Sequence, residues 1–169
     1  MIGARQEVRA ALNAADDELQ RAGEDAFLDE ISGELGFCHA RRALCAGTSF
    51  VVLGDGEQAE REALAALALF AEMPECVRWA AGELGARVDL GAARTLRGDL
   101  AGAEDSLEVV FALEPERRTE AVARRLTNLA RVLRATRYRN AAEARRISDA
   151  IEDFTAFSLS RGVIRAFNQ

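Results

Sequence analysis

The apolar positions of this chain follow helical spacing along most of its length. In the first segment, apolar residues recur every three or four positions and so share one helical face, namely Val8, Leu12, Ala15 and Leu19. No segment shows the alternation of apolar and polar residues, bounded by turn residues, that is typical of a strand. The pattern predicts seven helices, over residues 4–22, 27–53, 57–72, 76–97, 100–113, 116–136 and 140–156. We therefore expect an all-α fold.

A set of small and turn residues occurs twice, 44 residues apart: Gly47, Gly54, Asp55 and Ala59 return as Gly91, Gly98, Asp99 and Ala103. The second glycine follows a predicted helix end, where a left-handed backbone suits glycine, and the aspartate can cap the next helix. We expect the first glycine and the alanine to lie where two helices approach closely. The predicted connections are two to four residues long, so successive helices should be antiparallel.

Each such helix pair leaves an apolar face that only a neighbouring pair can cover, so these units stack. We predict an antiparallel helical-hairpin solenoid over residues 1–156, followed by a C-terminal tail at 157–169. Composition agrees with this prediction. Alanine, the best helix former, supplies 34 of the 169 residues, and the 49% hydrophobic content is enough for a packed core.

Charge is distributed unevenly. The net charge is −6, which argues against a general nucleic-acid binder, yet residues 117–146 carry ten arginines against Glu120 and Glu143. This basic helix pair keeps nucleic-acid contact open as an alternative. The three cysteines lack the spacing of a disulfide framework, no signal peptide begins the chain, and no apolar run approaches the roughly 20 residues of a membrane span. We expect a cytoplasmic protein that does not enter membranes.

Residues that could carry chemistry have simpler structural interpretations. His39 has no nucleophile or carboxylate motif around it, and Cys38 and Cys45, seven residues apart, are expected to pack as small buried side chains. Trp79 is expected to fill a gap near a turn. Plain turn or solvated roles are likewise expected for Gly54-Asp55-Gly56 and for the acidic pairs Asp16/Asp17, Asp29/Glu30 and Glu60/Glu62. We predict no catalytic residue, no metal site and no cofactor.

The arginines offer the strongest indication of a binding site. Arg87 and Arg94 are seven residues apart in the fourth predicted helix, and Arg117, Arg124 and Arg131 share this spacing in the sixth, with Asn128 beside them. In right-handed helical solenoids the first helix of each pair lines the concave groove, where arginine forks bind carboxylates, phosphates or a peptide backbone. The predicted groove residues are Arg87, Arg94, Arg124, Asn128 and Arg131. The alternative is a solvated stripe paired with Glu83, Asp89 and Glu120.

The glycine, Gly-Asp, alanine and proline positions resemble the tetratricopeptide repeat. Phe50 matches its helix A aromatic in the first unit, whereas Arg94 takes that place in the second, and the period is longer than is usual in that family. Four phrases also resemble the C-terminal region of large bacterial helix-turn-helix (XRE-type) transcriptional regulators, at residues 78–87, 96–104, 113–120 and 137–140. That resemblance implies a sensor or effector region. It does not imply DNA binding, because the chain has no candidate helix-turn-helix domain.

We therefore expect a non-enzymatic module that binds a protein, a peptide or a small anionic ligand. The alternative from another class is a structural homo-oligomerisation domain, in which the first helix, lacking a preceding partner helix, packs against a second protomer.

If the groove assignment is correct, replacing both Arg124 and Arg131 by alanine will abolish capture of the ligand or partner and leave helical content unchanged. Circular dichroism and a capture assay on the same preparation check this. Undiminished capture would refute the assignment.

Overall fold

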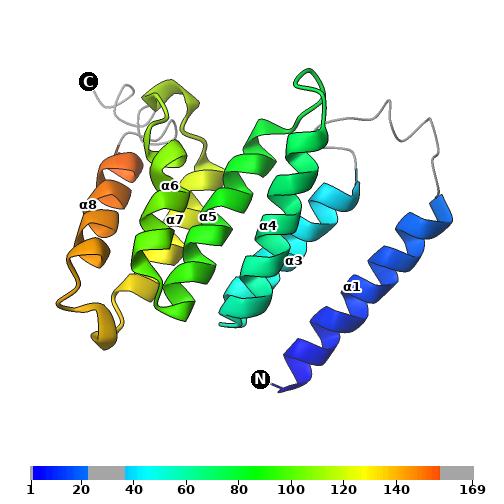
Figure 1. Ribbon diagram of the computed structural model, residues 1–169, viewed down its shortest axis with the longest axis horizontal. Helices are drawn as coiled ribbons and strands as arrows, with labels where there is room; N and C mark the ends of the chain where they lie inside the picture. Colours follow the sequence, from blue (N-terminus) through cyan, green and yellow to red (C-terminus); the bar gives the residue numbers. More distant parts are fainter. Residues whose placement is uncertain (1, 23–36, 157–169) are drawn as a thin grey trace, which may run out of the picture.

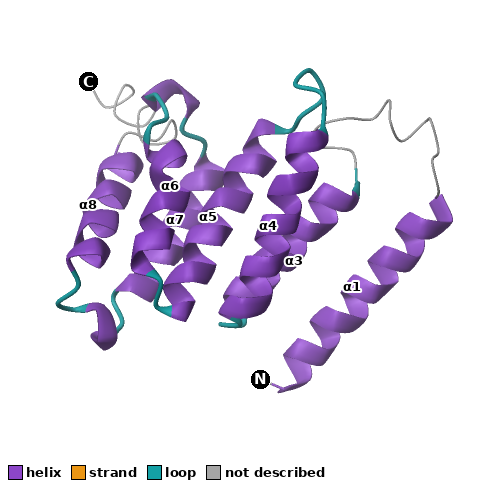
Figure 2. Ribbon diagram, viewed as in Figure 1, coloured by secondary structure: helices purple, strands orange, loops and turns teal. Residues whose placement is uncertain are grey.

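All regular structure in the described part of the chain is helical. The computed structural model describes residues 2–22 and 37–156, and no strand occurs within them (Figures 1 and 2). These residues form seven α-helices: α1 (Ile2–Ala22), α3 (His39–Val52), α4 (Gly56–Glu72), α5 (Ala80–Arg97), α6 (Leu100–Phe111), α7 (Glu120–Leu133) and α8 (Ala142–Ala156). Two 3-10 turns, η1 (Pro115–Arg117) and η2 (Thr136–Tyr138), precede α7 and α8. The prediction of an all-helical chain is confirmed for these residues.

The helices from α3 to α8 form two rows. Helices α3, α5 and α7 pack on one another in that order, and α6 packs on α8. Helix α4 packs on α3 and α5, α6 packs on α5, and α1 contacts α3. Consecutive helices alternate in direction, and α3 and α7 lie behind α4 and α6 in Figure 1. The row α3–α5–α7 therefore presents a continuous face, and the candidate functional site lies on this face.

Two helix starts differ by four residues from the sequence prediction. Helix α5 begins at Ala80 rather than 76, because the backbone turns after Pro74, whose carbonyl accepts from the Val77 and Arg78 amides. Helix α7 begins at Glu120 rather than 116, because the Thr119 hydroxyl caps it by accepting from the Val122 amide. Arg117 consequently lies in η1 and is not part of a stripe on α7.

The connections also differ from the prediction. Those before α4 and α6 are short, but residues 73–79, 112–119 and 134–141 form longer links than the two to four residues expected. Of the second predicted helix, only its part from His39 onward lies in the described residues. Residues 27–36 and the tail at 157–169 lie outside them.

The repeated turn has the predicted chemistry in both copies. Gly54 and Gly98 have φ of 69° and 88°, the left-handed region that favours glycine. The Asp99 carboxylate accepts from the Gly102 amide at 2.9 Å, and Asp55 does the same for Gln58 at 3.3 Å. Each aspartate thereby satisfies an otherwise unpaired N–H group at the start of the following helix.

The helices approach closely where the repeat places its small residues. A Cβ atom added at Gly91 would lie 2.8 Å from Cγ of Leu107, and one at Gly47 would lie 3.4 Å from the backbone nitrogen of Ala63. Ala59 and Ala103 are both 0% exposed. The expectation that these four positions lie at close helix contacts is confirmed.

The core divides into a larger and two smaller clusters. The largest lies between α5, α6, α7 and α8 and contains Leu107, Leu126 and Phe154. A second surrounds Phe70, where α3, α4 and α5 meet, and a third surrounds Phe50, onto which Val8 and Leu12 of α1 pack. Alanine fills many of the remaining core positions, so the helices are held at short separation.

Ion pairs join helices at the N-terminal end. The Arg42 guanidinium on α3 donates to Asp16 of α1 at 2.6 Å and to Glu62 of α4 at 2.8 Å. Glu60 of α4 accepts from both Arg94 and Arg97 of α5. The acidic residues predicted to be solvated thus include three that tie one helix to another.

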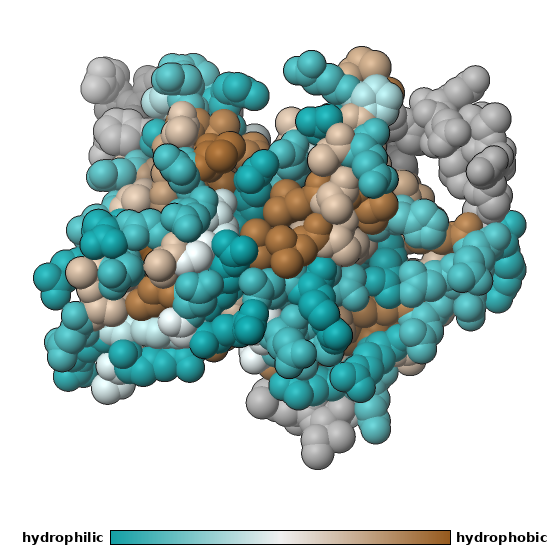
Figure 3. Space-filling view, viewed as in Figure 1, coloured by the Kyte–Doolittle hydropathy of each residue, from teal (hydrophilic) through white to brown (hydrophobic). Residues whose placement is uncertain are grey.

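The face drawn in Figure 3 carries apolar groups over α4 and the upper part of α6 and is elsewhere mostly polar. The most exposed large apolar side chains of α4 and α6 are Leu64 and Val109, at 45% and 50%. Across the described residues, no helix has both the length and the apolar character needed to cross a lipid bilayer.

Overpacking provides a test of the helix contacts. Ala59→Leu and Ala103→Leu will each lower the free energy of unfolding by about 1–3 kcal/mol, because no space exists for three further carbons. Ala65→Leu and Ala101→Leu, at exposed positions of the same helices, are the matched controls and will change it little. Chemical denaturation measures all four; equal behaviour of the two pairs would contradict close packing at these alanines.

Candidate functional site

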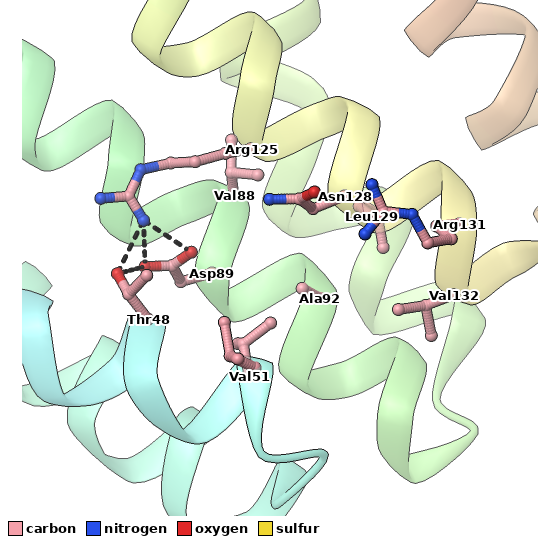
Figure 4. Close-up of a pocket in the computed structure, with 11 residues that line it drawn as sticks. Thr48, Val51, Val88, Asp89, Ala92, Arg125, Asn128, Leu129, Arg131 and Val132 are labelled. Carbon is pink, nitrogen blue, oxygen red and sulfur yellow. Dashed lines mark hydrogen bonds and ion pairs between the residues drawn. The ribbon is translucent and has the colours of Figure 1, made fainter. Parts of the chain in front are cut away.

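A groove of about 280 Å³ lies on the α3–α5–α7 face (Figure 4). Its apolar lining comes from all three helices: Val51 and Val52 of α3, Val88 and Ala92 of α5, and Leu129 and Val132 of α7. Its polar lining consists of Thr48, Asp89, Arg125, Asn128 and Arg131. An apolar cleft with a few convergent polar groups is the usual form of a binding site.

Three polar side chains join the three helices at one end of this groove. Nη1 of Arg125 on α7 lies 2.9 and 2.7 Å from the two carboxylate oxygens of Asp89 on α5. The same nitrogen donates to Oγ1 of Thr48 on α3 at 2.7 Å, and that hydroxyl lies 2.6 Å from Oδ2 of Asp89. Figure 4 shows these contacts as dashed lines converging between α3, α5 and α7. We call these residues the Asp89–Arg125–Thr48 cluster.

The carboxylate of this cluster is buried and the guanidinium is only partly so. The Asp89 side chain is 5% exposed and that of Arg125 is 27% exposed. Burial raises the pKa of Asp89 above its ordinary value, opposed by the positive charge of Arg125 and by hydrogen bonds from Thr48 and Arg125. Gly85 makes room for the arginine, because a Cβ there would lie 3.3 Å from Nε of Arg125. The glycine therefore permits the guanidinium to cross α5.

Two further polar side chains line the groove with no partner of their own. Neither Asn128 nor Arg131 makes a side-chain hydrogen bond or ion pair with a described residue, and both are exposed. In Figure 4 the Asn128 amide points along the groove toward Arg125, and the Arg131 guanidinium points toward Asn128. Their donors are thus available to a bound molecule.

The structure brings together only part of the predicted arginine set. Asn128 and Arg131 line the groove, and Arg124 is exposed one turn before Asn128 on the same face of α7 but does not line it. Arg87 pairs with Glu83 of its own helix at 3.0 Å. Arg94 bonds to Glu60, to the Gly102 carbonyl and to Ser106, and so joins α4, α5 and α6. The two rows of arginines do not face one another across this groove, because the side chains of Arg87 and Arg94 are held by these other contacts.

The Asp89–Arg125–Thr48 cluster was not predicted. Asp89 interrupts an otherwise apolar run from Val88 to Ala93, which is a signal that its carboxylate is buried and needs a positive partner. Sequence alone does not say which of 22 arginines supplies it, since Arg125 lies 36 positions away.

The other candidate residues identified from the sequence are either packed against the core or exposed. His39 is exposed. Cys45 is exposed, so its predicted burial is wrong; it lies on the solvent side of α3, and Cys38 is half-buried. The Trp79 ring packs against the second core cluster and lies 4.9 Å from the Arg41 guanidinium carbon. Within residues 2–22 and 37–156, no group of three or more histidines, cysteines or acids is placed to hold a metal ion.

The basic segment 117–146 is partly used in internal contacts. Arg146 forms two bonds of 2.7 Å with Glu104, Arg137 bonds to the Leu96 carbonyl, and Arg118 packs on the Phe154 ring. With Arg125, four of its ten arginines therefore stabilise contacts between elements. The remaining six make no ion pair with a described residue.

Comparisons of this chain with protein-family models, with curated proteins and with solved structures found no match.

Asp89 is more deeply buried than Arg125, so replacing one or the other will lower the free energy of unfolding by different amounts. Arg125→Ala leaves a buried carboxylate unpaired and will cost about 3–5 kcal/mol of unfolding free energy at about pH 7. Asp89→Asn leaves a partly solvated guanidinium that still has an amide oxygen to bond, so it will cost about 1–2 kcal/mol.

The cost of Arg125→Ala will also depend on pH. Without Arg125, the pKa of folded Asp89 rises further above its value in the unfolded chain, so folded Asp89 takes up a proton first as pH falls. The stability difference between wild type and Arg125→Ala will therefore narrow between about pH 7 and about pH 4. Denaturation curves at several pH values measure it, and a constant difference would mean that Asp89 is not the group left unpaired.

Proposed function

We propose that this chain is a non-enzymatic binding module whose groove on the α3–α5–α7 face holds a ligand or a partner segment. The observation that carries the proposal is the combination of an apolar groove with two polar side chains, Asn128 and Arg131, that have no partner among the residues the structure describes. Both side chains are exposed and point along an apolar surface, so their donors face any molecule that occupies the groove.

The groove's chemistry favours binding over catalysis. Its one carboxylate, Asp89, is already bonded to Arg125 and Thr48, so it is not poised to accept a proton from a substrate. The remaining lining residues are apolar, an amide and an arginine, which bind and orient but do not transfer protons near neutral pH.

We further propose that the helices stack as a tetratricopeptide-like solenoid. The 44-residue repeat and the packing of α3, α5 and α7 in one row support this arrangement. Together with the phrases that resemble bacterial transcriptional regulators, it suggests an effector region that works in the cytoplasm. A ligand that prefers one relative placement of the hairpins would shift the population toward that placement and alter a coupled domain or protomer.

The rim of the groove supports occupation by a molecule from outside the chain. Val52 of α3 is 78% exposed beside this groove, more than any other large apolar side chain of the described residues. An apolar group at the rim contributes to binding when a ligand or partner covers it.

Site-specific photo-crosslinking tests the proposal in cells. With benzoylphenylalanine at Val52, the protein will form a discrete adduct, detected as a mass increase by intact-protein mass spectrometry. The matched control is Val109, an exposed valine of α6 that does not line the groove. Asn128→Trp, a change at an exposed position that fills the groove, will remove the adduct.

Equal labelling at Val52 and Val109, or an adduct that survives Asn128→Trp, would contradict binding at this groove.

A further inference from the structure

We infer that the groove takes a small aliphatic molecule carrying a single carboxylate. This inference rests on the proposed binding function and names the chemical class of the ligand. It follows from the size of the groove, its apolar lining and the balance of charges within it.

The size and lining specify the body of the ligand. The volume of about 280 Å³ corresponds to about nine water-sized volumes, and therefore to a ligand of roughly that many non-hydrogen atoms. The surfaces that such a ligand would cover are aliphatic, from Val51, Ala92, Leu129 and Val132. Among the described residues, no aromatic side chain lines the groove, so these residues offer no stacking platform for a planar ring.

The charges specify the polar group. Asp89 and Arg125 neutralise one another at one end, which leaves Arg131 as the one uncompensated charge among the described residues that line the groove. Its fork matches the two oxygens of a carboxylate, and the adjacent Asn128 amide supplies a further donor.

A second negative charge on the ligand would be unfavourable. Arg131 is already used by the first carboxylate, so a second negative charge would have no partner among the described lining residues, and Val52 and Arg131 lie in the last turns of α3 and α7, where the helix dipole is negative. None of the described lining residues belongs to the first turn of a helix, so these residues do not supply the backbone N–H groups that commonly bind phosphate. These features favour a monocarboxylate over a phosphate ester.

Nuclear magnetic resonance titration of the isotope-labelled protein with octanoate, octylamine and octyl phosphate tests the inference. Octanoate will shift the signals of the groove residues and bind at least tenfold more tightly than either of the others. Arg131→Met, which keeps the length of the side chain and removes its charge, will weaken octanoate binding about tenfold. Arg134→Met, at an exposed arginine next to α7 that does not line the groove, will not.

The results separate this inference from the proposed function. Equal binding of the three probes, no effect of Arg131→Met, or no shift of groove signals by octanoate would each overturn the monocarboxylate. In all three cases the proposed function stands if Val52 still forms the adduct and Asn128→Trp removes it. The proposed function fails if the adduct at Val52 is also absent.

Discussion

The close approach of helices at small residues is the constraint on which the rest of the structure depends. A Cβ atom at Gly91 would clash with Leu107 of α6, Gly47 lies in close contact with the backbone of α4, and Ala59 and Ala103 are completely enclosed. Each short contact determines which side of α3 or α5 faces α4 or α6. It therefore also determines which residues lie on the opposite side of that helix. The groove between α3, α5 and α7 is the space that these orientations leave.

Small residues bring helices together but bury little apolar area each, so this chain also uses charged contacts between elements. Arg42 joins α1, α3 and α4, Arg94 joins α4, α5 and α6, and the Asp89–Arg125–Thr48 cluster joins α3, α5 and α7. Removing the charged groups of an ion pair from water is costly, and only a favourable geometry compensates this cost. Such pairs therefore contribute little to the free energy of unfolding and more to the selection of one helix arrangement. We interpret these contacts as setting the relative position of neighbouring hairpins.

Local features of the fold could be predicted because their causes are local. The left-handed glycines, the aspartate caps and the existence of each helix follow from nearby residues, and all are present in the described part of the chain. The predicted start of α7 is four residues too early, because the prediction does not include the cap at Thr119. Arg117 is therefore predicted on α7, whereas it lies in η1. The cause of this error is also local and could have been found.

The candidate site was predictable only on α7. Arg131 is predicted from its seven-residue spacing and Asn128 from its place beside that stripe, which suffices because both lie on one helix face. Arg94 and Arg125 could not be assigned in this way. Whether an arginine faces a groove or a buried acid depends on partners such as Glu60 and Asp89, which lie 34 and 36 positions away. The packing of distant helices decides these pairings, and a single sequence does not encode them in its periodicity.

The most direct test of the account is the proton distance across the α5–α6 contact in solution. If helices nest at the repeated glycines, the α-protons of Gly91 will show strong nuclear Overhauser effects to the Leu107 methyl groups, since a Cβ at Gly91 would lie 2.8 Å from Cγ of Leu107. The same experiment will connect the α-protons of Gly47 with the methyl group of Ala63 on α4. Absence of both effects in the folded protein would contradict close packing at these glycines, and with it the orientation of α3 and α5 that forms the groove.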